Sequence, residues 1–156
     1  GEDVVISLRV KDVYNSDMHS LVVDKDTPVE DVIKSFVKKP ELRGIFIVDE
    51  KKQLIGVITR HDLVTWAKFM AGVPQAKNVN DISESIRVLS KTAEGMIRKE
   101  TKNAAVKLDD NINTALDKMI SLDLIDVPVV NGKDKVVGDL QLVKILKAII
   151  EKEPKK

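Results

Sequence analysis

Thr59 and Asp62 are the residues of this chain whose types and spacing best suit chemistry. They follow the apolar run that ends at Ile58 and precede a helical pattern of apolar residues. A carboxylate at such a strand-to-helix junction can accept two hydrogen bonds from a sugar diol, and a threonine hydroxyl can donate to a phosphate oxygen. Backbone N–H groups at the start of a helix also favour anions. The pair is therefore a candidate site for a ligand that carries a diol and a phosphate.

The same spacing has a purely structural interpretation. Thr-x-x-Asp before an apolar helical stripe is also a capping box, which adds roughly 1 kcal/mol to helix stability without any ligand. The two roles are compatible, because the aspartate can cap the helix while the site is empty. The spacing alone favours the capping interpretation.

Residues for other chemistry are scarce in the sequence. His19 and His61 are the only histidines and cysteine is absent, so that Asp62 beside His61 is the only neighbour at metal-ligand spacing. The chain has no Ser-His-Asp grouping and no glycine-rich phosphate loop. Because a lone carboxylate cannot complete a general acid/base cycle, we expect a protein that is not an enzyme and holds no metal.

The charge balance argues against other classes of partner. The 156 residues include 26 basic and 25 acidic side chains, so no global field attracts nucleic acid or an anionic membrane. No apolar run approaches the length that spans a bilayer, and the amino terminus lacks the apolar segment of a signal peptide. We therefore expect a cytoplasmic protein that binds neither membrane nor nucleic acid.

The elements that position Thr59 and Asp62 occur twice in the chain. The segment 56–63 recurs at 138–145, and the segment 46–49 recurs at 128–131, in both cases 82 residues further along. A duplicated unit usually needs its twin to bury its apolar face. The two copies therefore predict one folded body with a groove between them.

Each copy predicts the same β-α-β-β-α succession of elements. In the first copy, Thr27 is predicted to cap a helix that has Pro28 at its first position and ends at Pro40. The connection is predicted to be a loop over 71–80 and a docked helix over 81–90. The predicted strands are 20–23, 45–48 and 54–58, then 104–108, 127–130 and 135–139; further helices follow Thr59, span 112–122 and end at Glu151.

A tandem of such units, with Pro128-Val129-Val130 in one strand and Gly56-x-x-Thr59-x-x-Asp62 after another, resembles a pair of cystathionine-β-synthase (CBS) domains, also called a Bateman module. The resemblance covers roughly Val10 to Glu151. It implies an α/β (α+β) fold in which the two repeats pack sheet to sheet with pseudo-two-fold symmetry. The expected divisions are 1–71 for the first repeat, 72–92 for the connection and 93–156 for the second repeat.

The resemblance also implies a function. Modules of this family bind AMP, ADP, ATP or S-adenosylmethionine between the repeats and regulate a partner without doing chemistry. We therefore expect an allosteric, nucleotide-binding sensor with no cofactor, which meets Mg²⁺ only together with bound ATP. The alternative is a ligand-free structural or dimerisation module with degenerate clefts. A homodimer is predicted from apolar positions on the last helix of each repeat, namely Leu63, Trp66, Met70, Ile145, Ala148 and Ile149.

The resemblance divides the candidate ligand residues between two clefts. Thr59 and Asp62 match the family motif, whereas Gln141 and Lys144 replace these residues in the second repeat and remove its ribose-binding carboxylate. Asp126 would accept a hydrogen bond from an adenine amino group. The residues expected at the first site are Thr59, Asp62, Ile58, Arg60, His61, Arg98, Lys102, Ile125, Asp126 and Val127, and those expected at the second are Ser16, His19, Arg43, Gln141 and Lys144.

Overall fold

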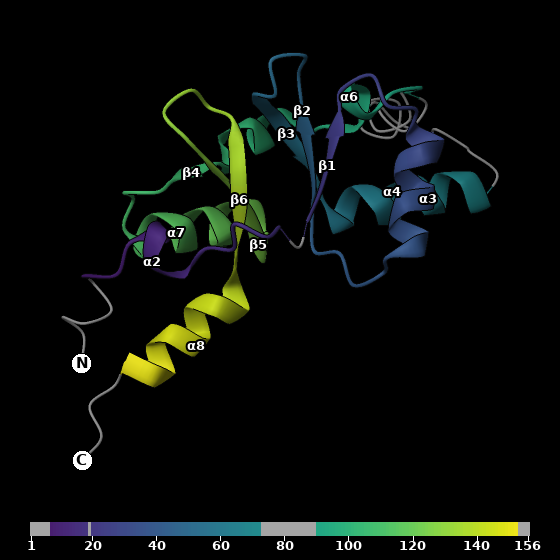
Figure 1. The fold of residues 1–156 in the computed structure, drawn as a ribbon. Helices are drawn as coiled ribbons and strands as arrows, with labels where there is room; N and C mark the ends of the chain where they lie inside the picture. The colour runs from purple at the N-terminus through teal and green to yellow at the C-terminus, as the bar shows by residue number, and fades with distance from the viewer. Residues whose placement is uncertain (1–6, 19, 73–89, 153–156) are drawn as a thin grey trace.

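The computed structural model describes residues 7–18, 20–72 and 90–152 (Figure 1). The first repeat contains β1 (Leu21–Asp24), α3 (Val29–Lys38), β2 (Ile45–Val48), β3 (Leu54–Ile58) and α4 (Arg60–Ala71). The second contains β4 (Val106–Lys107), α7 (Ile112–Leu122), β5 (Asp126–Val130), β6 (Val136–Gln141) and α8 (Leu142–Lys152). Both repeats therefore have the predicted β-α-β-β-α order, and the predicted α/β fold is confirmed.

The two sheets have the same topology and the same irregularity. In each sheet the first strand pairs parallel with the second, and the second pairs antiparallel with the third. The register shifts between Ile47 and Val48 in the first sheet and between Val129 and Val130 in the second. These positions are equivalent in the sequence repeat, so the two sheets have the same irregularity at the same place.

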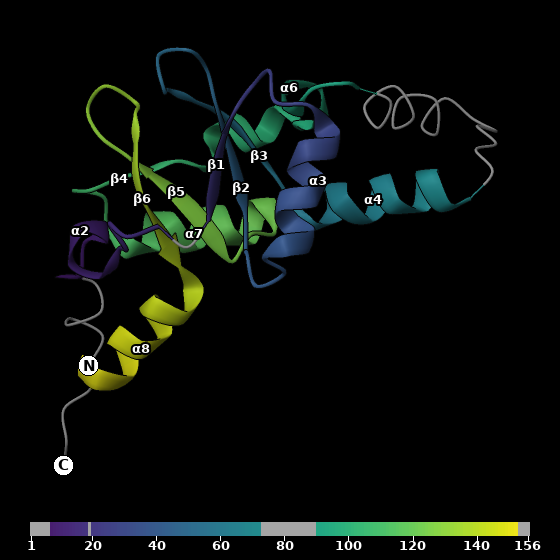
Figure 2. The ribbon, with the colours of Figure 1, turned by 45° about the vertical axis from the view of Figure 1, so that its right-hand side comes forward.

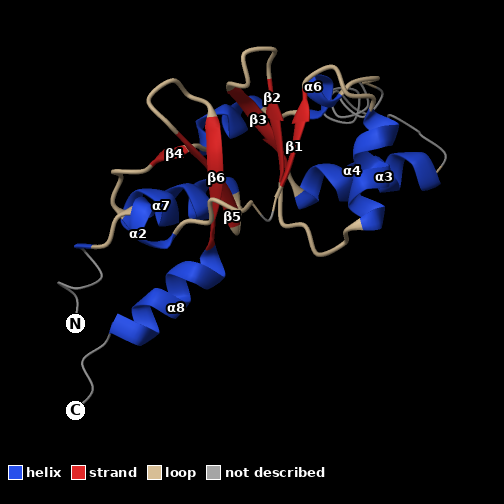
Figure 3. Ribbon diagram, viewed as in Figure 1, coloured by secondary structure: helices blue, strands red, loops and turns tan. Residues whose placement is uncertain are grey.

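The two sheets share an apolar core, and a second buried cluster packs Ile45 and Ile58 of the first sheet against Val32 of α3. Figure 3 shows the strands of both repeats in the middle of the molecule, with α3 and α4 on one side and α2 (Val10–Val13), α7 and α8 on the other. Phe46 and Val57 of the first sheet lie in the same buried cluster as Val127 and Leu140 of the second. This shared burial agrees with the prediction that each repeat needs the other to bury its apolar face.

The two hairpins are joined at their tips. The β2–β3 and β5–β6 hairpins project in the same direction (Figures 1 and 2). Leu54 N donates to Asp134 O at 3.2 Å, and Gln53 forms an isolated antiparallel bridge with Lys135. Backbone contacts therefore hold the repeats together at this end of the groove.

The segment before each repeat packs against the other repeat. Val10 N donates to Asp110 O at 2.9 Å, and this bond holds α2 against the second repeat. Ala93 N donates to Thr27 O at 2.8 Å, and this bond holds α6 (Ala93–Met96) against the first repeat. The two repeats thus exchange their leading segments, and periodicity within one repeat does not reveal such an exchange.

Gly56 and Gly138 lie where the exchanged segments cross the third strands. A Cβ atom at Gly138 would lie 2.3 Å from the backbone oxygen of Asn15, and one at Gly56 would lie 2.0 Å from Ile97 Cγ2. Neither position has room for a side chain. The repeated glycines therefore mark two close approaches between the leading segments and the sheets.

Some predicted boundaries were wrong. Thr27 does not cap α3, because Pro28 occupies the N-cap position and no side chain caps the helix. The strand predicted over 104–108 is confined to β4, since the preceding residues form the 3-10 helix η1 (Lys99–Ala104) against β3. Strand β6 runs on to Gln141, which pairs with Asp126. The loop predicted over 71–80 and the helix predicted over 81–90 lie almost entirely outside the described residues.

Candidate functional site

Thr59 and Asp62 form a reciprocal pair at the start of α4. Thr59 N donates to Asp62 Oδ2 at 2.8 Å, and Asp62 N donates to Thr59 Oγ1 at 3.3 Å, which completes a capping box. Thr59 Oγ1 also donates to Asp62 Oδ2 at 3.0 Å. Both residues are buried, with exposed fractions of 5% and 3%. The structural interpretation of the motif is therefore present, and the cap uses Oδ2 of the carboxylate.

Arg98 brings a cation to the other carboxylate oxygen. Its Nε lies 3.6 Å from Asp62 Oδ1, and its Nη2 donates to Thr59 Oγ1 at 3.5 Å. Its Nη1 donates to Glu100 Oε1 at 3.3 Å. The Arg98 side chain is 27% exposed and the Glu100 side chain 54% exposed. The site thus combines a buried carboxylate, a half-buried guanidinium and an exposed second acid.

Thr101 fixes the segment that carries Arg98. Val57 N donates to Thr101 Oγ1 at 3.1 Å, and this hydroxyl donates to Arg98 O at 2.7 Å. Thr101 is fully buried, so its hydroxyl ties η1 to β3 inside the protein. Thr101 was not among the predicted site residues, because in the sequence its hydroxyl looks like that of any solvated threonine. Lys102 is exposed, and none of its described contacts reaches Thr59 or Asp62.

Arg43 and Arg60 line a cavity where equivalent parts of the two repeats face each other. Arg43 and Ile125 occupy equivalent positions in the repeat, as do Arg60 and Leu142. Both arginines are exposed, and neither makes an ion pair within the part of the chain that the structure describes. The cavity measures about 420 Å³ and is lined by Arg43, Arg60, Ile125, Gln141, Leu142, Val143 and Leu146.

This cavity brings together residues that were expected at different sites. Arg60 and Ile125 were predicted for the first site, and Arg43 and Gln141 for the second, yet all four line the same space. A smaller cavity of about 260 Å³ shares the two arginines and extends toward the apolar side chains of Phe36, Leu42, Ile45, Ile58 and Leu63. Val127, by contrast, is fully buried in the shared core.

Asp126 lies between the repeats and bonds to Ser20. Ser20 Oγ donates to Asp126 Oδ2 at 2.6 Å. Asp126 is 1% exposed, and the neighbouring Asp139 is 0% exposed. Burial and the hydrogen bond with Asp139 raise the pKa of Asp126 to about 9, although the Ser20 bond and the charge of Arg43 act in the opposite direction. At neutral pH the Asp126 carboxyl therefore keeps its proton, and it faces Ser20 and Asp139.

The importance of Asp139 and Ser20 was not predicted. Asp139 occupies the position that Val57 has in the first repeat, and an acidic residue inside an apolar strand is a signal that the sequence does carry. Ser20 gave no such signal, since a serine at the start of a strand is ordinary. Only the packing of the two repeats brings Ser20 to Asp126.

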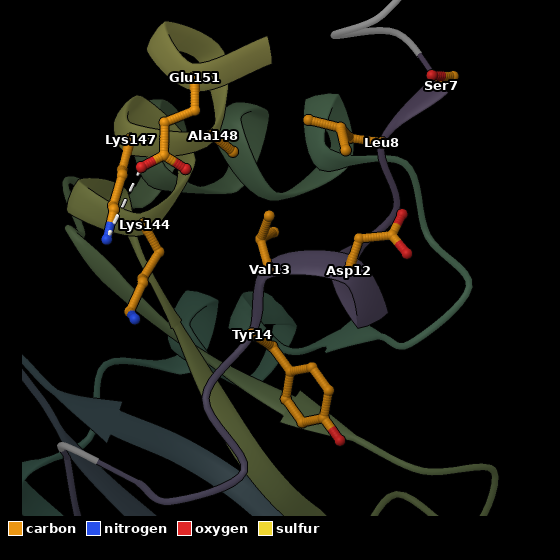
Figure 4. Close-up of a pocket in the computed structure, with 9 residues that line it drawn as sticks. All are labelled: Ser7, Leu8, Asp12, Val13, Tyr14, Lys144, Lys147, Ala148 and Glu151. Atoms are coloured by element: carbon orange, nitrogen blue, oxygen red, sulfur yellow. Dashed lines mark ion pairs between the residues drawn. The ribbon is translucent and has the colours of Figure 1, made fainter.

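The altered motif positions of the second repeat line separate cavities. Lys144 lies in a cavity of about 670 Å³ between α8 and the leading segment, where Figure 4 shows Lys144 and Lys147 across from Leu8 and Val13. Gln141 lines the cavity with Arg43, and its Oε1 accepts a hydrogen bond from Asn15 Nδ2 at 3.5 Å. Gln141 and Lys144 therefore do not converge on one ligand.

Of the two other residues predicted at the second site, only Ser16 lies within the described residues. Ser16 is exposed, and no contact of its side chain with Gln141 or Lys144 is described. His19 lies outside the described residues. The described part of the second cleft thus lacks a counterpart of the Thr59 and Asp62 pair.

The described residues show neither a metal centre nor a membrane span. Among residues 7–18, 20–72 and 90–152, no three acidic or histidine side chains gather where they could hold a metal ion. Within the same residues, no helix is both long enough and apolar enough to cross a membrane. His61 is exposed on the first turn of α4.

The paired repeats, the exchanged leading segments and the motif at the start of α4 define a tandem domain pair, and sequence comparison identifies its family. The CBS domain family model matches residues 10–68 and 97–151. This chain therefore belongs to the CBS domain family. No curated protein matches it in sequence.

Solved structures agree with this assignment over nearly the whole chain. A CBS domain-containing protein from Thermotoga maritima is 26% identical, with a TM-score of 0.72 over 95% of this chain and 98% of that one. CBSX2 in complex with AMP is 21% identical, with a TM-score of 0.72 over 93% and 98%. The CBS domain pair of protein MJ0100, in complex with 5′-methylthioadenosine and S-adenosyl-L-methionine, is 22% identical, with a TM-score of 0.63 over 91% and 99%.

Proposed function

We propose that this chain is a regulatory module that binds an adenosine-containing ligand between its repeats, at Thr59 and Asp62. The observation that carries the proposal is the Asp62 carboxylate, which is 3% exposed, caps α4 through Oδ2 and faces the Arg98 cation through Oδ1. A buried carboxylate suits the two hydroxyl donors of a ribose, and a guanidinium suits a phosphate. The nearby exposed arginines, Arg43 and Arg60, are further candidates for phosphate oxygens.

Two similar proteins support this ligand class. CBSX2 was solved with AMP, and the MJ0100 pair with 5′-methylthioadenosine and S-adenosyl-L-methionine. CBS-pair proteins are typically regulatory modules and not enzymes. The ligand would shift the relative orientation of the two repeats, or of two subunits, and a protein partner would respond to the change. The proposal includes no catalytic step and no resident cofactor, and Mg²⁺ enters only with bound ATP.

A thermal-shift titration tests the proposed function. Because a ligand that binds only the folded state stabilises it by mass action, a concentration of 100 times Kd should add about 2.7 kcal/mol. AMP, ATP and S-adenosylmethionine are the ligands to compare, with cytidine monophosphate as the control for the base, since it shares the ribose and phosphate of AMP. If none of the three adenosyl compounds raises the melting temperature at millimolar concentration, the proposal fails.

Calorimetry should find one strong site per chain. The first repeat keeps both polar motif residues, whereas Gln141 and Lys144 line separate cavities and supply no carboxylate. The fitted stoichiometry with the tightest adenosyl ligand is therefore expected to be one. Two equal and independent sites per chain would contradict the assignment to Thr59 and Asp62.

A structural module is the second candidate function. The capping box at Thr59 and Asp62 is complete without a ligand, which is the specific observation that favours this alternative. In that case the cleft would be empty in the cell and the chain would serve to join subunits. The thermal-shift titration separates the two functions.

The last helix of each repeat predicts a homodimer. Ile145 is fully buried, so it cannot contribute to an interface as the sequence pattern suggested. Four more of the predicted residues are partly buried and pack against the apolar cores, namely Leu63, Trp66, Ala148 and Ile149. Other apolar side chains on α4 and α8 are well exposed: Val64, Met70, Val143, Leu146 and Ile150. Light scattering at micromolar concentration should give the mass of a dimer, and the double substitution Val143→Glu with Leu146→Glu should lower it. A wild-type monomer under these conditions would refute the prediction.

A further inference from the structure

Arg98 occupies the side of the Asp62 carboxylate that a ribose would need. Its Nε faces Oδ1 at 3.6 Å, while Oδ2 is committed to the cap. A ribose diol that approaches Asp62 therefore meets a guanidinium already in place. Any ligand of this site must either accept Arg98 where it stands or displace it.

We infer that Arg98 selects for adenosine ligands that carry a phosphate, because it exchanges Asp62 for the phosphate when the ligand binds. The inference rests on the proposed function and names the ligand class of that site. It separates nucleotides such as AMP from the neutral nucleoside adenosine and from S-adenosylmethionine, whose sulfonium is cationic. Arg98 is thus a specificity residue of the cleft.

The geometry of Arg98 suits such an exchange. Its contacts with Asp62 Oδ1 at 3.6 Å and with Thr59 Oγ1 at 3.5 Å are longer than the usual 2.7–3.2 Å of a strong hydrogen bond. The side chain is 27% exposed, so the guanidinium can turn without opening the core. Its backbone is anchored, because the buried Thr101 hydroxyl donates to Arg98 O at 2.7 Å. Arg98 therefore combines an anchored backbone with a partly exposed charged end whose contacts are long.

The energetic balance differs among the three ligand types. A diol is neutral, and when it displaces Arg98 from Asp62 it leaves the guanidinium with Glu100, whose side chain is 54% exposed and well solvated. A phosphate offers the displaced guanidinium a paired, charge-assisted contact in exchange. A sulfonium would instead meet Arg98 as a like charge. Arg60, which follows the cap residue Thr59 in the sequence, is a further cation of the same sign.

Calorimetry with three probes tests the inference on the full chain. Adenosine, AMP and S-adenosylmethionine are titrated into the wild-type protein, Arg98→Gln and Lys107→Gln. Lys107 is exposed on β4, so its substitution removes the same charge away from the cleft. A thermal melt of each variant checks that it is folded. Arg98→Lys, which keeps the charge and loses the planar fork, is the second variant.

Removal of Arg98 should reduce the preference for AMP over adenosine. In the wild-type protein and in Lys107→Gln, AMP should bind at least about tenfold more tightly than adenosine. In Arg98→Gln, AMP should weaken about tenfold while adenosine stays within about threefold of its wild-type affinity. S-adenosylmethionine should bind the wild type more weakly than AMP and should gain in Arg98→Gln. Arg98→Lys should lie between the two.

The outcomes distinguish the inference from the function on which it rests. An unchanged ratio of AMP to adenosine affinity in Arg98→Gln, or a wild-type preference for S-adenosylmethionine, overturns the role of Arg98 and leaves the adenosine site standing. Equal losses in Arg98→Gln and Lys107→Gln overturn it as well, because they would reflect net charge alone. If neither the wild type nor Arg98→Gln binds any of the probes, the proposed function itself fails.

Discussion

Replacement of Asp126 by asparagine is expected to raise the melting temperature at pH 8 and to remove most of its decline between pH 5 and pH 9. Asp126 is 1% exposed between the repeats, and its pKa is raised to about 9. At pH 7 the unfolded chain has released this proton, whereas the folded protein still holds it. The difference lowers the free energy of unfolding by at most roughly 4 kcal/mol, because each pH unit above the ordinary pKa of an aspartate counts for about 1.4 kcal/mol. Asparagine does not titrate and avoids this loss.

The direction of the pH dependence follows from the raised pKa. The unfolded chain releases the Asp126 proton near the ordinary value of 3.8, whereas the folded protein holds it to about 9. Between these values the folded state binds more protons than the unfolded state, so stability falls as pH rises. Below the lower value the full stability is present. An asparagine amide can still accept from Ser20 and can donate to Asp139.

Thermal denaturation of both proteins at several pH values from 5 to 9 measures this effect. Asp17→Asn is the matched control, because Asp17 is exposed and the substitution removes an aspartate without changing the interior. The gap between Asp126→Asn and the wild type should widen with pH, while the control follows the wild type. Parallel curves for Asp126→Asn and the wild type would show that the buried carboxyl is not protonated.

Asp62→Asn is expected to weaken binding of the best adenosyl ligand by about 2 kcal/mol, near thirtyfold, with little change in the melting temperature of the ligand-free protein. Asparagine keeps one acceptor oxygen, which can still receive Thr59 N and Oγ1 as Asp62 Oδ2 does at 2.8 and 3.0 Å. It loses the charge and the acceptor at Oδ1, where a ribose hydroxyl would bind. The contact of Asp62 Oδ1 with Arg98 Nε is long, at 3.6 Å, and Arg98 keeps its contact with Glu100, so we expect the loss of the Asp62 charge to cost the apo protein roughly 1 kcal/mol.

Asp12→Asn is the matched control for the cap. Asp12 Oδ2 accepts from Arg9 N at 2.9 Å at the start of α2, in the same way that Asp62 serves α4, but Asp12 is exposed and lies in the exchanged leading segment. Its substitution should leave ligand affinity unchanged. If Asp62→Asn also binds every adenosyl ligand as tightly as the parent, Asp62 is a cap only and the structural interpretation stands.

The repeat, the order of elements and the N-terminal motif of α4 could all be predicted from the sequence. Strands β2 and β3 begin and end at the predicted residues, because short apolar runs between polar turns are local signals. The capping box at Thr59 and Asp62 is equally local, since its hydrogen bonds join residues three positions apart. Thr27 shows the limit of such signals. Its side chain is suitable for capping α3, but Pro28 occupies the N-cap position.

The charged surroundings of the motif depended on the tertiary structure. From the sequence, Arg98 was only one of several cations expected near the cleft. The sequence could not show that Arg98 contacts Asp62 while Lys102 is exposed. The choice follows from η1, whose Thr101 binds β3 across 44 positions in the sequence. Likewise, Arg43 and Arg60 share a cavity because the repeats meet there, although each was expected at a different site.

The sequence by itself therefore determined the two-repeat fold, the family and the motif at Thr59 and Asp62, because periodicity and capping act over a few residues and a repeat is found by comparing the chain with itself. Only the tertiary structure decided that the leading segments are exchanged, that Arg98 faces Asp62 and that Asp126 is buried against Ser20. These features join residues far apart in the chain. Their energies depend on burial and on charge separation in the folded protein, and neither quantity exists before the two repeats pack together.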